Sequence, residues 1–309
     1  MPIASRTLQH AAERPVDGRV AGSYLQPLLE AAAARGVAPD DLARAAGLAD
    51  GALTPLPDTL AVSAYVRLLD AGAVLANDAH FGLHVGERVK LGTYNVYGLI
   101  LLSCRDFGQA LQQTLRFEAL AHDLGRSALS VTDGIAEYRW HSAMPHASRH
   151  LAESVFAGIR VFAEWLAGRT LPAVQITFAH DASEELGEYR RIFGGPVTFG
   201  AKEHCARFDA ALLTWPVPNA DPGLYPVLQQ HAEQFNCCEK SRALKKRATS
   251  WSRYGRRSCA TWRRTARVCR RLRGSCGSRS VPCKESWAKS ALVSNRCWTG
   301  RGTNWQPIT

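Results

Sequence analysis

The sequence predicts an α+β fold, in which helices pack on a small and mostly antiparallel sheet, for the larger part of this 309-residue chain. Segments with apolar residues at helical spacing stand before and after segments in which apolar and polar residues alternate. The turn dipeptide Asp133-Gly134 joins two of the alternating segments. The composition, 46% apolar and 21% charged, is typical of globular proteins. It excludes a chain that is disordered or collagen-like over its whole length.

Three helices are predicted in the N-terminal part. The first covers residues 24–35, where Leu25, Leu28, Leu29 and Ala32 recur at helical spacing before a stop at Gly36. Asp58 is predicted to cap a second helix, whose apolar stripe runs through Val62, Val66, Leu69 and Ala73. Asp106 is predicted to cap a third, which places Ala110, Leu111 and Leu115 on one face.

The pattern then changes to strands. Residues 127–132 and 135–141 are rich in strand-forming residues, and the dipeptide between them accepts the positive φ angles of a hairpin turn. A long helix follows, because five apolar residues fall on one helical face: Leu151, Val155, Ile159, Phe162 and Leu166. We further expect a strand at 174–178, a helix at 184–193, and a helix that starts at Asp221-Pro222.

Charge divides the chain into two unlike parts. Residues 1–236 hold 19 Lys and Arg against 25 Asp and Glu, whereas residues 237–309 hold 19 basic residues and two acidic ones. The second part also contains seven of the nine Cys and five of the eight Trp, but too few aliphatic residues for a core. The sequence therefore predicts an N-terminal extension at 1–23, a folded domain at 24–236, and a basic, largely unstructured tail at 237–309.

The common catalytic and metal-binding motifs are absent from the sequence. It contains no P-loop, nucleophile elbow, zinc-protease helix or Cys-x-x-Cys pair, so we expect neither an enzyme nor a metal or other cofactor. The longest apolar stretch, Tyr97 to Cys104, is too short to cross a bilayer, and the first 20 residues lack the apolar region of a secretory signal. We therefore expect a cytoplasmic protein with no membrane partner.

A few residues are candidates for binding a metal ion or a ligand. His146, His150 and Glu153 have the spacing of metal ligands on one helical face, but a solvated helix start is the favoured interpretation. Glycines at 82, 86, 92 and 98 favour turns and close packing over a phosphate loop. Four aromatic residues are candidates for lining a ligand pocket, with ordinary sheet packing as the alternative: Tyr94, Tyr138, Trp140 and His141.

Three groups of residues carry a family resemblance. They are HFGLHVGERVKLGTYNVYG at 80–98, the RH-x-x-E pattern at 149–153, and EYRRIFGGPVTFG at 188–200, which FDAALL and QQHAEQ follow up to Gln234. In these residues the chain, from about Tyr24 to Gln234, resembles the N-terminal effector-binding and dimerisation domain of one branch of the AraC family of bacterial transcription regulators. The resemblance implies a homodimer that senses a small molecule and ends in two helix-turn-helix units.

The tail departs from that plan in a way that the genetic code explains. Trp and Cys codons both begin with TG, so a frame slipped by one base reads Leu, Val or Met at each of these positions. The twelve Cys and Trp residues of the tail thus mark twelve apolar residues in the other frame. Codons compatible with residues 271–309 also permit a string containing RSLQRKL, which resembles the recognition helix of an AraC-type unit. We interpret the tail as out of frame.

Two functions from different classes follow. The first is the ligand-sensing and dimerisation domain of an AraC-like regulator, which binds operator DNA only if the reading frame of the helix-turn-helix part is restored. The alternative is an intact protein whose basic tail binds nucleic acid without sequence specificity, through phosphate neutralisation and base stacking.

Overall fold

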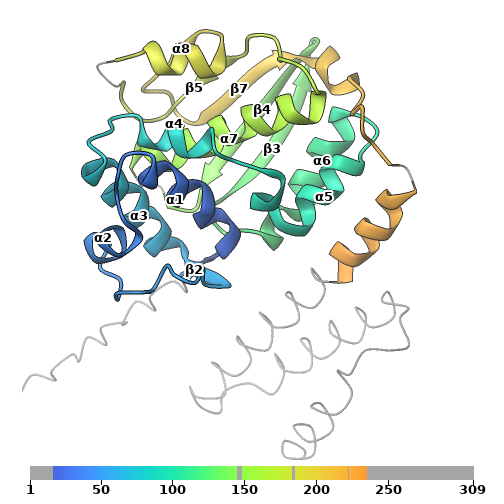
Figure 1. Cartoon of the computed structure of the whole chain (residues 1–309). Coiled ribbons are helices and arrows are strands. Elements are labelled where there is room, and N and C mark those ends of the chain that lie inside the picture. Colours follow the sequence, from blue (N-terminus) through green and yellow to red (C-terminus); the bar gives the residue numbers. More distant parts are fainter. Residues whose placement is uncertain (1–16, 145–147, 183–184, 222, 235–309) are drawn as a thin grey trace, which may run out of the picture. The chain divides into compact units, whose positions relative to one another are not determined.

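The computed structural model describes residues 17–144, 148–182, 185–221 and 223–234 (Figure 1). The chain divides into two units, Met1–Cys238 and Glu239–Thr309, and all described residues belong to the first. The predictions made for residues 237–309, and for His146, lie outside the described residues.

The domain contains a five-stranded sheet with the strand order β3-β4-β7-β5-β6. Its strands are β3 (Gly125–Thr132), β4 (Ile135–Ser142), β5 (Gln175–Thr177), β6 (Val197–Thr198) and β7 (His204–Asp209). All neighbours pair antiparallel except β5 and β6. The hairpin prediction is confirmed, since Asp133 and Gly134 connect β3 to β4 with φ angles of 51° and 78°. The predicted fold class is confirmed as well.

The long helix α7 (Arg149–Ala167) lies over this sheet (Figure 1), as the stripe of apolar residues predicts. Phe156 of α7 packs between two aromatic rings of the sheet region: its ring centroid is 6.3 Å from that of Tyr138 and 5.5 Å from that of Phe178. Aromatic edge contacts of this kind bury large apolar areas and fix the position of one element on another. The helix is therefore anchored at its middle.

The N-terminal segment contains a second, two-stranded sheet and three helices. The helices are α1 (Leu25–Ala33), α2 (Pro39–Ala45) and α3 (Val62–Leu75). The predicted cap at Asp58 is wrong, because Thr59–Ala61 forms strand β2 and α3 begins after Ala61 without a side-chain cap. Strand β2 pairs with β1 (Arg19–Ala21), about forty positions earlier in the sequence, and a local pattern does not reveal such a distant partner.

Helices α5 (Asn95–Ser103) and α6 (Phe107–Phe117) form one side of the domain. The predicted cap of α6 is confirmed: the backbone N–H of Gln109 donates to Asp106 Oδ1 at 2.7 Å. After α8 (Gly187–Phe193) and β7, the described chain ends in a helix at residues 224–234. Among the described residues, no helix is both long and apolar enough to cross a membrane.

The short helix α4 (Phe81–Gly86) packs closely against α7 through two glycines. A Cβ atom built on Gly82 would lie 2.5 Å from the Cα and carbonyl oxygen of His150, and one on Gly86 would lie 2.5 Å from the Cβ of Ala157. These glycines serve close packing between two helices, as expected from the sequence. The absence of a side chain lets the two backbones approach each other.

The Gly82→Ala variant should destabilise the fold despite the higher helix propensity of alanine. Overpacking a well-packed interior typically costs about 1 to 3 kcal/mol, whereas the gain in helix propensity is at most about 1 kcal/mol. Urea unfolding of the full chain measures the difference. Gly92→Ala is the matched control, because a Cβ there meets no atom within 4 Å. A Gly82 variant as stable as the control would show that the two helices do not need this close approach.

Candidate functional site

An aromatic cavity lies inside the domain, between α5, α6, α7 and the hairpin of β3 and β4. The volume open to the centre of a water molecule is about 100 Å³. Its wall is mostly apolar and includes eight aromatic rings: Tyr24, Tyr65, Tyr94, Tyr97, Phe107, Tyr138, Trp140 and Phe162. A mostly apolar cavity with a few polar groups is the usual form of a small-molecule site.

The structure brings three of the four sequence candidates to this cavity. Tyr94 lies on the wall at the start of α5, while Tyr138 and Trp140 reach it from β4. His141 is exposed and is not part of the wall. The reason is the pleat of the strand, in which neighbouring residues point to opposite faces and residues 138 and 140 share the inner one.

The main polar group of the cavity is Glu118, whose side chain is 4% exposed. The backbone N–H of Ser127 donates to Glu118 Oε1 at 2.8 Å, and the Ser127 hydroxyl lies 2.6 Å from Oε2. The same hydroxyl is 2.5 Å from that of Tyr138. Burial raises the pKa of Glu118, although the hydrogen bonds from Ser127 oppose this shift.

His122 lies one helical turn beyond Glu118 and also faces the cavity. Its backbone N–H donates to the carbonyl of Glu118 at 3.1 Å, and its ring lies edge-on to Tyr24 with centroids 5.2 Å apart. Burial, with a contribution from Arg126, lowers the pKa of His122 to about 4, so the ring is neutral at pH 7. Its Nδ1 atom is buried without a hydrogen-bond partner among the described residues.

Sequence reasoning missed Glu118, His122 and Ser127. The spacing of Glu118 and His122, four residues apart, would place both on one face of a helical turn, and this is the signal that was available. The tyrosines of the cavity are neutral as well, since burial raises the pKa values of Tyr24, Tyr94 and Tyr97 above the ordinary value of 10.0.

A separate buried junction joins α4, α7 and α8. Glu153 is fully buried, accepts a hydrogen bond from the hydroxyl of Tyr189, and lies 3.7 Å from Arg149 Nε and 3.3 Å from His150 Nδ1. The N–H of Gly82 donates to the same His150 Nδ1 at 3.2 Å. Burial raises the pKa of Glu153, but the neighbouring His150 ring and the hydrogen bond from Tyr189 outweigh this effect, and the net shift is downward. The interpretation of this segment as a solvated helix start is therefore wrong.

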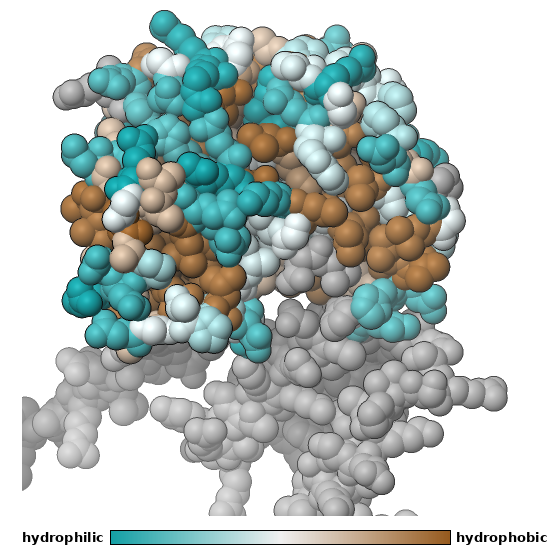
Figure 2. All heavy atoms as spheres, viewed as in Figure 1, coloured by the Kyte–Doolittle hydropathy of each residue, from teal (hydrophilic) through white to brown (hydrophobic). Residues whose placement is uncertain are grey.

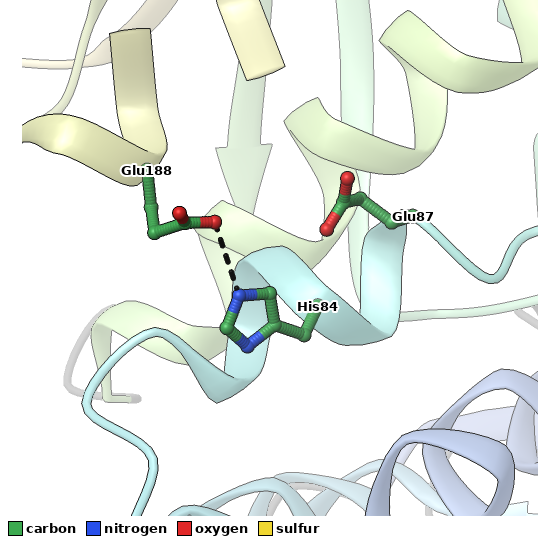
Figure 3. A group of neighbouring side chains, drawn as sticks. All are labelled: His84, Glu87 and Glu188. Atoms are coloured by element: carbon green, nitrogen blue, oxygen red, sulfur yellow. Dashed lines mark hydrogen bonds and ion pairs between the residues drawn. The ribbon is translucent and has the colours of Figure 1, made fainter. Parts of the chain in front are cut away.

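His84, Glu87 and Glu188 lie close enough together to resemble a metal site (Figure 3). Their partners show an ion-pair network instead. The guanidinium of Arg191 contacts both oxygens of Glu87, at 2.6 and 2.7 Å, and Oε2 of Glu188 at 2.6 Å. His84 Nε2 is 3.2 Å from Glu188 Oε2. A cation bound here would have to displace Arg191 from both carboxylates, so the network favours a structural role in holding α8 against α4.

Comparisons with known proteins agree on one class. The model of the N-terminal arabinose-binding domain of AraC transcription regulators matches residues 36–217. An ornithine utilization regulator from Pseudomonas aeruginosa is 27% identical over 216 residues, which cover 68% of this chain and 63% of that protein. The chain thus spans less than two thirds of that relative's length.

A solved structure shows a similar fold. The transcriptional regulator CdpR from Pseudomonas aeruginosa superimposes with a TM-score of 0.54 at 16% sequence identity, over 93% of this chain and 89% of that one. At this level of identity the likeness concerns the fold alone.

The neutral state of His122 predicts a loss of stability in mild acid. Its pKa is about 4 in the folded protein and about 6.5 in the unfolded chain, so the unfolded chain binds the proton first as pH falls. Above pH 6.5 the ring is neutral in both states and does not lower the free energy of unfolding. As pH falls from 6.5 toward 4, the free energy of unfolding decreases by about 3 kcal/mol in all. Urea unfolding of the full chain between pH 7 and pH 4.5 measures this loss.

His122→Phe should show a shallower fall in stability than the unchanged chain over this range. The half-buried His204, whose pKa is also lowered to about 4, contributes equally in both proteins. The exposed His141→Phe serves as the control and should keep the original pH dependence. Equal slopes for the His122 variant and the control would contradict the assignment.

Proposed function

The chain belongs to the family of N-terminal arabinose-binding domains of AraC transcription regulators, and on this premise we propose that its cavity binds a small organic effector and that the chain is the sensing part of a transcription regulator. The observation that carries the proposal is an aromatic cavity with a buried ring nitrogen, Nδ1 of His122, that lacks a partner among the described residues. A ligand supplies what such a group lacks.

The polar groups of the cavity support binding without turnover. The wall contains two serines: Ser154, whose hydroxyl donates to the carbonyl of Leu151, and Ser127, whose hydroxyl bonds to Glu118 and Tyr138. Among the described residues, no hydrogen bond joins Ser127 to the imidazole of His122. Serine nucleophiles are usually activated by an imidazole base, and because Ser127 lacks this partner the arrangement favours a sensor over an enzyme.

Two further parts of the proposal concern assembly and place of action. We propose a homodimer, as the family resemblance implies. Large apolar side chains are available on the surface for such contacts, including Val74, Val131 and Val227, which are 80%, 51% and 61% exposed. Figure 2 shows apolar side chains at the surface in several areas among polar ones.

Action in the cytoplasm, where bacterial transcription takes place, belongs to the same proposal.

The tail limits the proposal. With 19 basic and two acidic residues at 237–309, and with Cys and Trp where the other frame gives apolar residues, we propose that the chain as written has lost sequence-specific DNA binding. The same charge supports the alternative function, weak and non-specific binding of nucleic acid that falls steeply with salt through counterion release.

Ligand binding is tested by thermal shift of the full chain against a panel of small organic metabolites. A ligand at a hundredfold excess over its Kd should stabilise the fold by about 2.7 kcal/mol. Ala163→Phe, which fills the cavity from α7, should abolish the shift. Ala33→Phe, at an exposed position of α1, is the matched control and should retain it. Shifts that survive in the Ala163 variant would place the ligand elsewhere.

Loss of DNA recognition is tested by a one-base repair of the gene near codon 235. The repaired protein should select a defined site from random DNA at physiological salt, because a restored core holds a recognition helix rigidly against base edges. The chain as written should bind weakly and without preference. Selection of a defined site by the unrepaired chain would contradict the frame interpretation.

A further inference from the structure

The wall of the cavity includes a connected group of polar residues around Glu118. Glu118 and His122 lie one turn apart there, joined by the backbone hydrogen bond from residue 122 to residue 118. Tyr24 contacts the ring of His122, and Ser127 links Glu118 to Tyr138. Oε1 of Glu118 accepts a hydrogen bond from the backbone N–H of Ser127.

This group contains a carboxylate, and no Lys or Arg is among the described residues that line the cavity. The nearest basic group, Arg126, does not line the cavity and is engaged by the carbonyls of His122 and Gly125 and by Asp123 Oδ1. Burial of a carboxylate without a paired cation is unfavourable, and the raised pKa of Glu118 reflects it. An incoming cation would relieve this strain, whereas an incoming carboxylate would add to it.

Two further features complement a cation. Nδ1 of His122, buried and unpartnered among the described residues, offers a lone pair when the neutral ring carries its proton on Nε2. The tyrosine rings offer faces with negative potential: Tyr94 lies 6.0 Å from Tyr24 and 5.3 Å from Tyr97 between ring centroids. Aromatic faces attract ammonium groups, most strongly where water is excluded. The rest of the wall is apolar, with Phe107, Leu111 and Phe162 among its residues.

We propose that the cavity is specific for protonated amines with an apolar body, and that the ammonium group lies between Glu118, Nδ1 of His122 and the tyrosine rings. This inference rests on the proposed function, since it names the chemical class of the effector. It assigns Glu118 as the residue that determines charge specificity. It also excludes ligands whose main polar group is a carboxylate, because no described residue of the wall supplies the cation that would pair with it.

A matched series of small molecules tests whether the full chain prefers protonated amines. 2-Phenylethylamine, 2-phenylethanol and phenylalanine share one aromatic body and differ in the ammonium and carboxylate groups, and hexylamine and octylamine extend the amine series. Calorimetry should show at least one amine binding tenfold or more tightly than the alcohol and phenylalanine. An alcohol or phenylalanine that binds as tightly as the best amine, or the absence of binding by all amines, overturns the proposal.

The Glu118→Gln variant tests whether Glu118 determines charge specificity. This variant should lower the affinity for the best amine at least tenfold while the affinity for 2-phenylethanol stays within a factor of two. Glu185→Gln, which removes the same charge from an exposed position, is the control. Equal loss for amine and alcohol overturns the assignment of Glu118, and the wild-type probe series decides the class even if this variant does not fold.

The metabolite panel separates this inference from the function on which it rests. If neutral or anionic metabolites bind and Ala163→Phe abolishes their binding, the cavity is an effector site and the amine inference is wrong. If Ala163→Phe abolishes no binding at all, the effector site itself is wrong.

Discussion

The close approach of α4 to α7 is the constraint on which the rest of the domain depends. Gly82 and Gly86 let the two backbones meet, and this contact buries Glu153 completely. A buried carboxylate is tolerated only where donors surround it, and the hydroxyl of Tyr189 on α8 is one of them. The close approach at Gly82 and Gly86 thus helps to position α4, α7 and α8 relative to one another. It also fixes the cavity, because α7 and the segment after α4 supply much of the wall.

The residues that carry the family resemblance mainly build this junction. The patterns at 80–98, 149–153 and 188–200 lie far apart in the sequence and meet in the Glu153 cluster and in the ion pairs of Arg191 with Glu87 and Glu188. The polar end of the cavity, at Glu118, His122 and Ser127, lies outside all three patterns. The junction and this polar end therefore use different residues, whereas Tyr94 and Tyr97 of the first pattern also line the cavity wall.

The sequence predicted the elements whose signals are local. The turn at Asp133-Gly134 and the cap at Asp106 depend on residues within a few positions, and both are present. The strand at 59–61 was missed because its partner at 19–21 is distant. The sequence predicted Tyr138, Trp140 and His141 together as aromatic wall residues of the hairpin, but His141 points to the other face because neighbouring residues of a strand alternate. Glu118 and His122 were missed because a short turn offers no periodic pattern, and only the assembled cavity shows what they face.

The wall of the cavity is also connected to the C-terminal end of the described domain. Helix α6 contributes Phe107, Ala110 and Thr114 to the wall. The N–H of Phe107 donates to the carbonyl of Trp215 at 3.0 Å, and Arg116 at the other end of α6 forms an ion pair with Glu233 at 2.7 Å. A ligand shifts a conformational equilibrium only by its difference in affinity for the two states. A ligand that contacts α6 therefore acts on a wall helix that is bonded both to Trp215 and to the helix at residues 224–234.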